Sequence, residues 1–587
     1  MTAVTVWAPE AEQLLLDCGG SRAPMVRQDG GWWRLETSAL AHGVDYAFHV
    51  DGNGPFPDPR SPWQPDGVHG PSRRVDHQLF EWSDQGWRAP PLAAAVIAEI
   101  HVGTFTREGS FEAVIDRLDH LLELGVTHLE LMPVQEFPGD RGWGYDGVNL
   151  FAPHHAYGGP EGLKRLVDAC HRRGLAVLLD VVYNHLGPDG NYLGQFGPYF
   201  TDAYSTPWGE AVNLDRAHSD EVRRFFIDNA LMWLRDYHFD GLRIDAVHAI
   251  IDTSAVHLLE ALSAAVRQLE SRTGRPLVLI AESDLNDPRL IRPVEIGGYG
   301  LEAQWNEDFH HALHAVLTGE SNGYYADFGT LGHLAKVLTR GFAYDGTYSR
   351  YRRRAHGRPA VDVPGRRFIG CLQNHDQVGN RATGERSSHL LSPALLKVGA
   401  ALVLTSPFVP MLFQGEEWGA SSPFLYFTDH RDPELAEAVR AGRREEFSAF
   451  GWDPESIPDP QSEDTFLRSR LDWDERSRAP HAGILDWHRS LVRLRRSHPA
   501  FAEDRLDRLR VSVDEARRCI LLRRSGMVTA CNLGKEPQTL ALPPELAGLE
   551  LRLGSAPGIE LRGTTLRLPE ECAAILTLAV HATAPRD

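Results

Sequence analysis

An arginine and an aspartate two residues apart form the first group in this chain that could do chemistry. In the stretch Gly241–His248, apolar and polar residues alternate, which predicts a short strand with Arg243 and Asp245 on one face. At the carboxyl end of a strand in a parallel barrel, such residues lie where active sites are built. A buried ion pair that only completes the strand is the alternative interpretation.

Three other motifs also follow short apolar runs. They are Asp180–His185 after Leu175–Leu179, Glu282 after Leu277–Ile280, and Gln373–Asp376 after Phe368–Leu372. With the Arg243–Asp245 stretch, these motifs resemble, in content and order, the four short motifs of the α-amylase family of glycoside hydrolases. In that family they end strands three, four, five and seven of a (β/α)8 barrel. The resemblance weighs against the ion-pair interpretation, because one motif alone is weak but four in order are specific.

The resemblance implies a role for each of three carboxylates. Asp245 would be the nucleophile, with Arg243 beside it, Glu282 the proton donor, and Asp376 a residue that stabilises the transition state. Neighbouring strands lie about 4.8 Å apart, so the tips of strands four and five can bring two carboxylates close together. A separation of about 5–5.5 Å is typical of retaining glycosidases, whereas inverting enzymes need about 6.5–9.5 Å. We therefore expect a retaining enzyme.

A second set of residues is expected to bind the sugar. Trp143 and Tyr145 lie in a glycine-rich loop, residues 142–149, and flat aromatic rings suit the apolar faces of pyranoses; the family's stacking tyrosine matches Tyr145. His185 and His375 match histidines that bond sugar hydroxyls, while Asp180 and Asn184 are expected to support the site. The remaining expected contacts are Arg243, His248, Asp308, Phe309, His310, His311, Gln377 and Asn380. For each of them a purely structural role is the alternative.

The motifs also depart from two branches of the family. Plain α-amylases have Lys-His three and four residues after the nucleophile, where this chain has His248 and Ala249. Branching enzymes carry a paired Glu-Glu at the acid motif, where this chain has Glu282 and Ser283. The variants resemble a branch that cleaves the α-1,4 bond next to a terminal trehalose. Branching or debranching of an α-glucan is the alternative activity, and a catalytically inactive carbohydrate-binding barrel is a weaker one.

The expected strands and helices that position these residues divide the chain into three domains. Residues 1–88 are rich in short alternating runs and turns and are expected to form a β-sandwich that resembles a carbohydrate module. Residues 89–500 are expected to form the catalytic barrel with insertions, and residues 501–587 a C-terminal β-sandwich. Within the barrel we expect helices over 111–124, 219–237 and 253–269, strand six over 301–304 and strand eight over 408–413.

Composition narrows the classes of partner. Acidic residues give a net charge of −20, and no Lys/Arg-rich block stands out, which argues against nucleic acid or an anionic membrane. The six cysteines have no spacing typical of zinc sites or a disulfide framework. With three carboxylates as the candidate catalytic groups, no cofactor and no metal is expected in the chemistry; calcium bound by Asp and Asn in a loop is the alternative. No signal segment or membrane span is visible, and a cytoplasmic location is expected.

Overall fold

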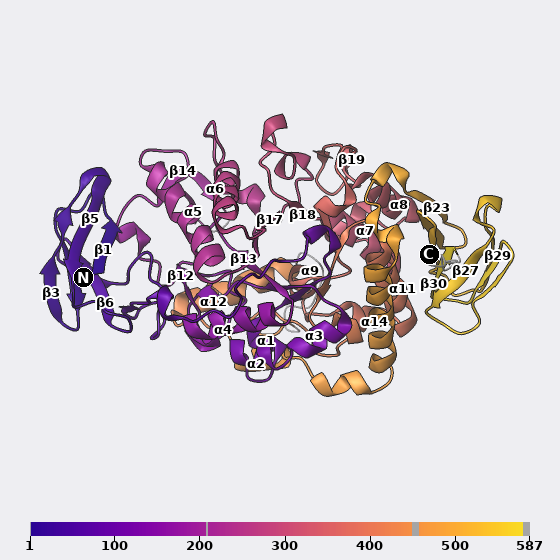
Figure 1. Ribbon diagram of the computed structural model, residues 1–587, viewed down its shortest axis with the longest axis horizontal. Coiled ribbons are helices and arrows are strands. Elements are labelled where there is room, and N and C mark those ends of the chain that lie inside the picture. Colours follow the sequence, from indigo (N-terminus) through magenta and orange to yellow (C-terminus); the bar gives the residue numbers. More distant parts are fainter. Residues whose placement is uncertain (1, 207–208, 449–456, 579–587) are drawn as a thin grey trace, which may run out of the picture.

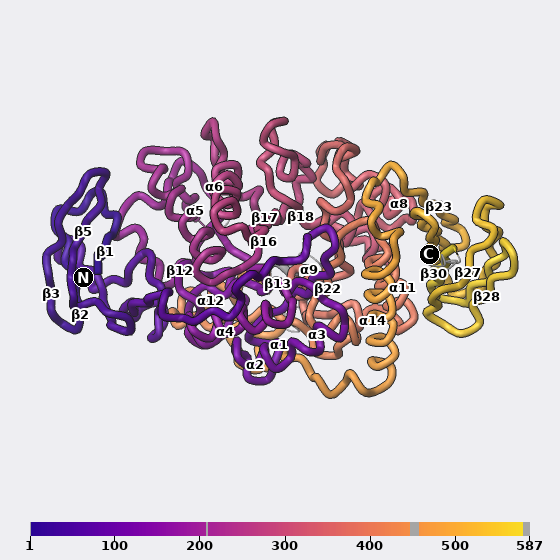
Figure 2. Tube along the Cα trace, viewed as in Figure 1, coloured from indigo at the N-terminus to yellow at the C-terminus, as the bar shows by residue number. Residues whose placement is uncertain are grey.

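The computed structural model describes residues 2–206, 209–448 and 457–578. The molecule is elongated, with β-sheets at both ends and a mixed helical and stranded body between them (Figure 1). The two ends of the described chain lie in these opposite sheet regions, as the tube in Figure 2 also shows.

The central body is built on a closed barrel of eight parallel strands. Around the barrel they are β9 (Ile97–Ile100), β10 (His128–Leu131), β13 (Ala176–Val181), β16 (Gly241–Ile244), β17 (Val278–Ala281), β18 (Ala303–Trp305), β21 (Phe368–Gly370) and β22 (Val409–Phe413), which pairs with β9. The strands are short and mostly apolar, as expected for strands that are buried on both faces, one in the barrel interior and one under helices.

Helices cover the outside of the barrel. The main ones are α4 (Gly159–Arg172), α5 (Ser219–Asp236), α6 (Leu258–Thr273), α7 (Glu307–Thr318), α8 (Leu331–Arg340), α11 (Pro393–Thr405) and α14 (His481–Ser497). Side chains from several strands fill the interior, among them Leu178, Ile280, Trp305 and Met411. Because the interior of the barrel is filled with side chains, a functional site must lie outside it, at the ends of the strands.

Three expected elements differ in the structure. The single helix expected over 111–124 is two helices, α2 (Phe111–Ile115) and α3 (Leu118–Leu124), with Gly125 capping the second in the left-handed region. The helix expected from residue 253 begins at Leu258, where the His257 side chain accepts the Leu259 N–H. Strand six begins two residues later and ends one residue later than expected, as Ala303–Trp305, and it pairs through Ala303 with Ile280 of β17.

The N-terminal part contains two antiparallel sheets. One has the order β1-β5-β4, formed by Thr2–Trp7, Trp32–Thr37 and Val26–Arg27. The other contains β2 (Leu14–Cys18), β3 (Ser21–Pro24), β6 (Asp45–Val50), β7 (Asn53–Phe56) and β8 (Ser72–Arg73). Arg60, between β7 and β8, pairs with Asp228 of α5 at 2.7 Å and lies over the rings of Trp32 and Phe225, which connects the sheets to the barrel.

The C-terminal part also contains two antiparallel sheets. The larger has the order β23-β24-β25-β30-β27, formed by Arg510–Asp514, Cys519–Arg524, Met527–Asn532, Cys572–Leu578 and Leu549–Gly554. The smaller has β26 (Gln538–Ala541), β29 (Thr565–Leu568) and β28 (Glu560–Arg562). Between β22 and α14 lie α12 (Pro433–Ser448) and α13 (Glu463–Arg468). Among all the described helices, none is long and apolar enough to cross a membrane.

Candidate active site

A buried guanidinium lies at the centre of the carboxyl ends of the barrel strands. Arg243 is 0% exposed, and its Nη1 donates to both oxygens of Asp180, at 2.9 and 2.8 Å, and to Asp245 Oδ1 at 2.7 Å. Its Nη2 lies 3.7 Å from Glu282 Oε2, and the Trp305 ring lies 4.2 Å beneath the guanidinium carbon. Arg243 thus compensates the charges of three carboxylates and, being fully buried, cannot contact the sugar as the sequence led us to expect.

Strand pairing places Asp245 beside Glu282. Ile244 of β16 is opposite Ala281 of β17, and the ladder continues past both strands, since the Glu282 N–H donates to Ile244 O at 3.0 Å. Asn184 then fixes the orientation of Asp245, because its Nδ2 donates to Asp245 Oδ2 at 2.8 Å. Two carboxylates on adjacent strand tips are the arrangement needed for cleavage of a glycosidic bond.

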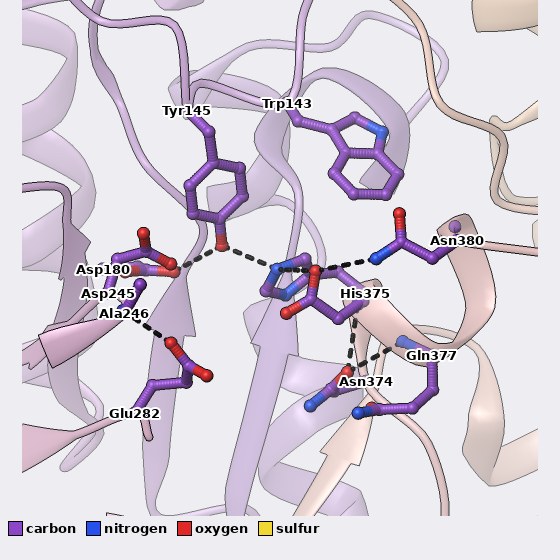
Figure 3. A network of polar contacts seen from close by, with 12 residues as sticks. Trp143, Tyr145, Asp180, Asp245, Ala246, Glu282, Asn374, His375, Gln377 and Asn380 are labelled. Carbon is purple, nitrogen blue, oxygen red and sulfur yellow. Dashed lines mark hydrogen bonds and ion pairs between the residues drawn. The ribbon is translucent and has the colours of Figure 1, made fainter. Parts of the chain in front are cut away.

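The backbone after Asp245 makes an unusual turn. Ala246 has φ 39° and ψ 52°, a left-handed conformation that is costly for a residue with a Cβ. This turn points the Ala246 N–H at Glu282 Oε2, 2.5 Å away (Figure 3). The strained residue therefore orients the second carboxylate with respect to the first.

Glu282 has a second carboxyl neighbour that the sequence analysis missed. Burial, and after it the nearby Glu282 charge, raise the pKa of Glu307, the first residue of α7, well above its usual range. Burial raises the pKa of Glu282, the Arg243 guanidinium opposes this, and the Asp245 charge adds to the rise. Glu307 directly precedes Asp308, and its position after strand six was the signal that could have identified it.

Asp376 approaches from the other side of the site. It lies in the first turn of α9 (His375–Gly379), just after β21, and its side chain is 40% exposed. Asn380, which is exposed, donates from Nδ2 to Asp376 Oδ1 at 3.3 Å. The charge of this accessible carboxylate acts on both Tyr145 and Glu282, so Asp376 lies on the same side of the barrel as the two strand tips.

His375 is held by protein groups on both ring nitrogens. Nδ1 lies 2.5 Å from Glu99 Oε1, and Nε2 lies 2.7 Å from the Tyr145 hydroxyl. Burial lowers the pKa of His375, but the Asp376 and Glu99 carboxylates outweigh it and raise this pKa to about 9. With 1% exposure, His375 acts here as a buried cation under the site, and the expected direct contact with a sugar hydroxyl is not available.

The two aromatic residues of the glycine-rich loop have different environments. Tyr145 is partly exposed, and its hydroxyl donates to Asp180 Oδ2 at 2.6 Å while its ring stacks on His375. Trp143 is 6% exposed, donates from Nε1 to Leu425 O at 2.9 Å, and stacks on Phe424. The expectation of a sugar platform fits Tyr145, whereas Trp143 packs in the wall behind it.

The side chains of residues 308–311 were expected to contact the sugar, but they are buried in the protein. Asp308 Oδ2 accepts from Asn286 Nδ2 and from the Ala343 and Tyr344 N–H groups, at 2.7–2.9 Å. Phe309 is 0% exposed, and His310 is bonded through both ring nitrogens, to Leu372 O and the Tyr325 hydroxyl. His311 is buried among the rings of Tyr324, Tyr325 and Phe328. These side chains anchor α7 because the helix turns them into the core.

Three other expected contacts lie in the segments that follow the strands. His185 is buried and its Nδ1 lies 2.5 Å from Asn184 Oδ1. His248 is exposed on the short turn Val247–Ala249 next to Asp284. Gln377 is half-buried, with Oε1 free of a hydrogen-bond partner in the described structure. Of the three, His248 and Gln377 have groups free to meet a ligand.

One group of potential metal ligands occurs among the described residues, and it includes none of the proposed catalytic carboxylates. It consists of Glu136, His154 and His155. His155 Nδ1 lies 2.6 Å from Glu136 Oε1 and its Nε2 lies 3.0 Å from Asp140 Oδ1, so both of its ring nitrogens already bind carboxylates. His154 Nδ1 accepts the Ala156 N–H. These three residues are therefore bonded to groups of the same segment, residues 136–155, and hold that segment together.

The barrel with Asp245, Glu282 and Asp376 at its strand ends defines a class of protein, the glycosidases of the α-amylase type. The family model "Alpha amylase, catalytic domain" matches residues 78–199. A Salmonella typhimurium protein provisionally described as an alpha amylase has a crystal structure with a TM-score of 0.90 and 38% identity, covering 98% of this chain and 97% of that one.

Two curated relatives narrow the class. Malto-oligosyltrehalose trehalohydrolase of Arthrobacter ramosus is 53% identical, over 95% of this chain and 97% of its own length. The enzyme of the same name from Mycobacterium tuberculosis strain H37Rv is 50% identical, over 93% and 95%. The chain belongs to the malto-oligosyltrehalose trehalohydrolase family and is a glycosidase.

Proposed function

We propose that this chain hydrolyses the α-1,4-glucosidic bond next to the terminal trehalose of maltooligosyl-trehalose, releasing trehalose and a maltooligosaccharide. The observation that carries the proposal is the pair of carboxylates, Asp245 and Glu282, on adjacent strand tips beside one buried guanidinium. The names of relatives that span nearly the whole chain support the choice of substrate.

In the first step Asp245 attacks the anomeric carbon of the glucose that precedes trehalose. The bond from that carbon to O4 of trehalose breaks, a proton from Glu282 passes to O4, and trehalose leaves. Arg243 and Asn184 hold Asp245 at the angle of attack. The covalent glycosyl-enzyme that forms is the intermediate of a retaining mechanism.

In the second step Glu282, now ionised, takes a proton from water, and the water oxygen attacks the same anomeric carbon. The bond to Asp245 breaks, and a maltooligosaccharide with the original α configuration leaves. Asp376, accessible at the opposite side, bonds hydroxyls of the distorted sugar ring, and Tyr145 provides its stacking surface.

The substrate implies a preceding reaction. A terminal trehalose on a maltooligosaccharide is made by an isomerisation of the reducing end, so we place this enzyme after a maltooligosyltrehalose synthase in trehalose biosynthesis. We further propose a cytoplasmic location, which the six free cysteines support, since disulfides are rare in reducing compartments. The partner is thus an α-glucan, and the net charge of −20 gives no support to nucleic acid or a membrane.

Product analysis tests the proposal. Wild-type protein incubated with maltotriosyl-trehalose should release trehalose and maltotriose in equal amounts, with the fresh maltotriose in the α configuration. Asp245→Asn should lose this activity by several orders of magnitude with an unchanged circular dichroism spectrum, because the nucleophile is removed. New α-1,6 linkages, loss of existing ones, or net inversion would instead contradict the proposal.

A further inference from the structure

A pocket of about 330 Å³ lies beside the barrel, between the segment that follows the N-terminal sheets and the start of α4. Residues of the segment 63–80 form one wall, and the first two turns of α4 form the other. Within the described residues, its lining includes none of the proposed catalytic carboxylates. Its volume is at the lower end of the range for ligand-binding pockets, about 300–1,000 Å³.

The Trp63 side chain in the first wall is held in one orientation. The Arg73 guanidinium lies over its ring at 5.0 Å, and Arg73 in turn forms an ion pair with Asp45. At the edge of the ring, a Cβ on Gly159 would lie 2.9 Å from Trp63 Nε1, so the glycine allows α4 to start directly against the indole. The half-buried ring is therefore a rigid apolar surface in the wall of the pocket.

The second wall contributes a buried ammonium group. Lys164 is 2% exposed, and its Nζ donates to His77 O at 3.2 Å. The rings of Phe80 and Tyr237 lie 5.6 and 5.5 Å from Nζ, and in the described part of the chain no carboxylate forms an ion pair with it. A buried lysine without a paired carboxylate is unusual, and an ammonium group has three donors. Lys164 thus has donors to offer a ligand in the pocket that it lines.

The charged groups around the pocket balance one another. Asp76 and Glu161 are acidic, whereas Lys164 and Arg165 are basic. Such a lining disfavours an anion, which the two carboxylates repel, and it disfavours a cation, which the two basic groups repel. A sugar hydroxyl both donates and accepts, so it can bond a group of either sign, and the two aromatic rings provide flat apolar surfaces for a pyranose. The pocket therefore suits a neutral sugar.

We propose that this pocket is a second, non-catalytic binding site for an α-glucan chain. The choice of ligand rests on the glucan substrate proposed above. α4 ends at Arg172 just before β13 begins at Ala176, so its other end, where the pocket lies, points toward the carboxyl ends of the strands. The pocket is thus on the same side of the barrel as Asp245 and Glu282, where a bound chain raises the local concentration of glucan near the catalytic site.

Retention in native gels that contain soluble starch tests this inference, with every protein carrying Asp245→Asn so that the starch stays intact. Lys164→Met keeps the aliphatic stem between the two rings and removes the donor, whereas Phe80→Ala removes an aromatic surface. Each should raise the apparent Kd for starch about tenfold. Lys397→Met is the matched control, because this half-buried lysine of α11 lines no part of the pocket, and it should bind starch like the parent protein.

The thermal stability of Lys164→Met separates a binding role from a structural one. Methionine fills similar space and removes a buried charge that lacks a paired carboxylate, so the apparent Tm should not fall. If Lys164 only attached α4 to His77, the apparent Tm would fall and starch retention would stay unchanged. That result would overturn the inference.

Two further outcomes would also overturn it. One is equal retention of the parent and of the folded pocket variants, for which Lys164→Met is sufficient if Phe80→Ala does not fold. The other is binding of inorganic phosphate, in place of starch, that is lost in Lys164→Met, since the pocket would then be an anion site. Retention does not depend on turnover, so a failed product analysis with the expected retention would contradict the proposed function alone. Unchanged retention with the expected products would contradict the pocket alone.

Discussion

At the scale of single residues, charge compensation governs the site. Arg243 and His375 are the buried cations, and each is surrounded by carboxylates from different strands: Asp180, Asp245 and Glu282 for the first, Glu99 and Asp376 for the second. Removing one partner of a fully buried pair such as Arg243–Asp180 leaves an uncompensated charge, at a cost of about 3–5 kcal/mol. The catalytic carboxylates are therefore part of the stability of the barrel end as well as of its chemistry.

The His375 charge predicts a pH dependence. Its pKa is raised to about 9 in the folded chain, against about 6.5 for an unfolded histidine. The stabilisation from protonated His375 should be complete below pH 6.5 and should be lost as the pH rises through 9. The apparent Tm of wild type minus that of His375→Gln should fall over this window, measured by thermal unfolding at constant ionic strength. A difference that is constant between pH 6 and 10 would contradict the cationic assignment.

At the scale of elements, the segments that follow two of the strands have different roles. The turn Val247–Ala249 presents His248 to solvent beside the nucleophile, whereas the first turn of α7 inserts Asp308 into the protein. Asp308 bonds two N–H groups of the segment 343–344 and thereby attaches that segment to the helix. Specificity is thus expected from the turn and rigidity from the helix.

We therefore expect two alanine substitutions to have different effects, one on substrate preference and the other on stability. His248→Ala should lower the preference for maltotriosyl-trehalose over maltopentaose, because a hydroxyl of the bent trehalose loses its partner. Asp308→Ala should destabilise the fold by about 3 kcal/mol, since it leaves buried donors unpaired, without changing the preference. Ratios of kcat/KM on the two substrates and denaturant unfolding measure both. An unchanged ratio in His248→Ala would locate the discrimination elsewhere.

At the scale of the whole molecule, sheets flank the barrel at both ends, and the site relies on protein charges throughout (Figure 1). All the proposed catalytic groups are carboxylates, and their charges are compensated by Arg243 and His375. The one potential ligand group in the described part of the chain, Glu136, His154 and His155, is internally hydrogen-bonded.

Exhaustive chelation should therefore leave turnover essentially intact. The measurement is the rate of trehalose release before and after treatment with a chelator, followed by addition of calcium or zinc. As a control, metal ions are removed with a chelating resin, so that no free chelator is present to bind the protein and affect its rate. Abolished turnover that recovers on adding a metal would overturn this expectation.

The sequence by itself determined the barrel class and the three catalytic candidates. Strands β13, β16, β17 and β21 are short, mostly apolar runs, and the polar residues that follow them lie at the carboxyl end by local pattern alone. Asp245, Glu282 and Asp376 could therefore be located without tertiary information. The order of the motifs also identified the family, which the relatives of high identity confirm.

Only the tertiary structure decided which neighbouring residues reach the site. Asp308, Phe309 and His310 follow a strand end as Glu282 does, but the direction of α7 turns them into the core and leaves Glu307, the first residue of the helix, partly exposed. Trp143 lies in a loop, yet contacts with Phe424 and Leu425, some 280 residues later, bury it. These outcomes depend on contacts between distant segments that form when the barrel closes, and a local pattern of residues carries no signal for them.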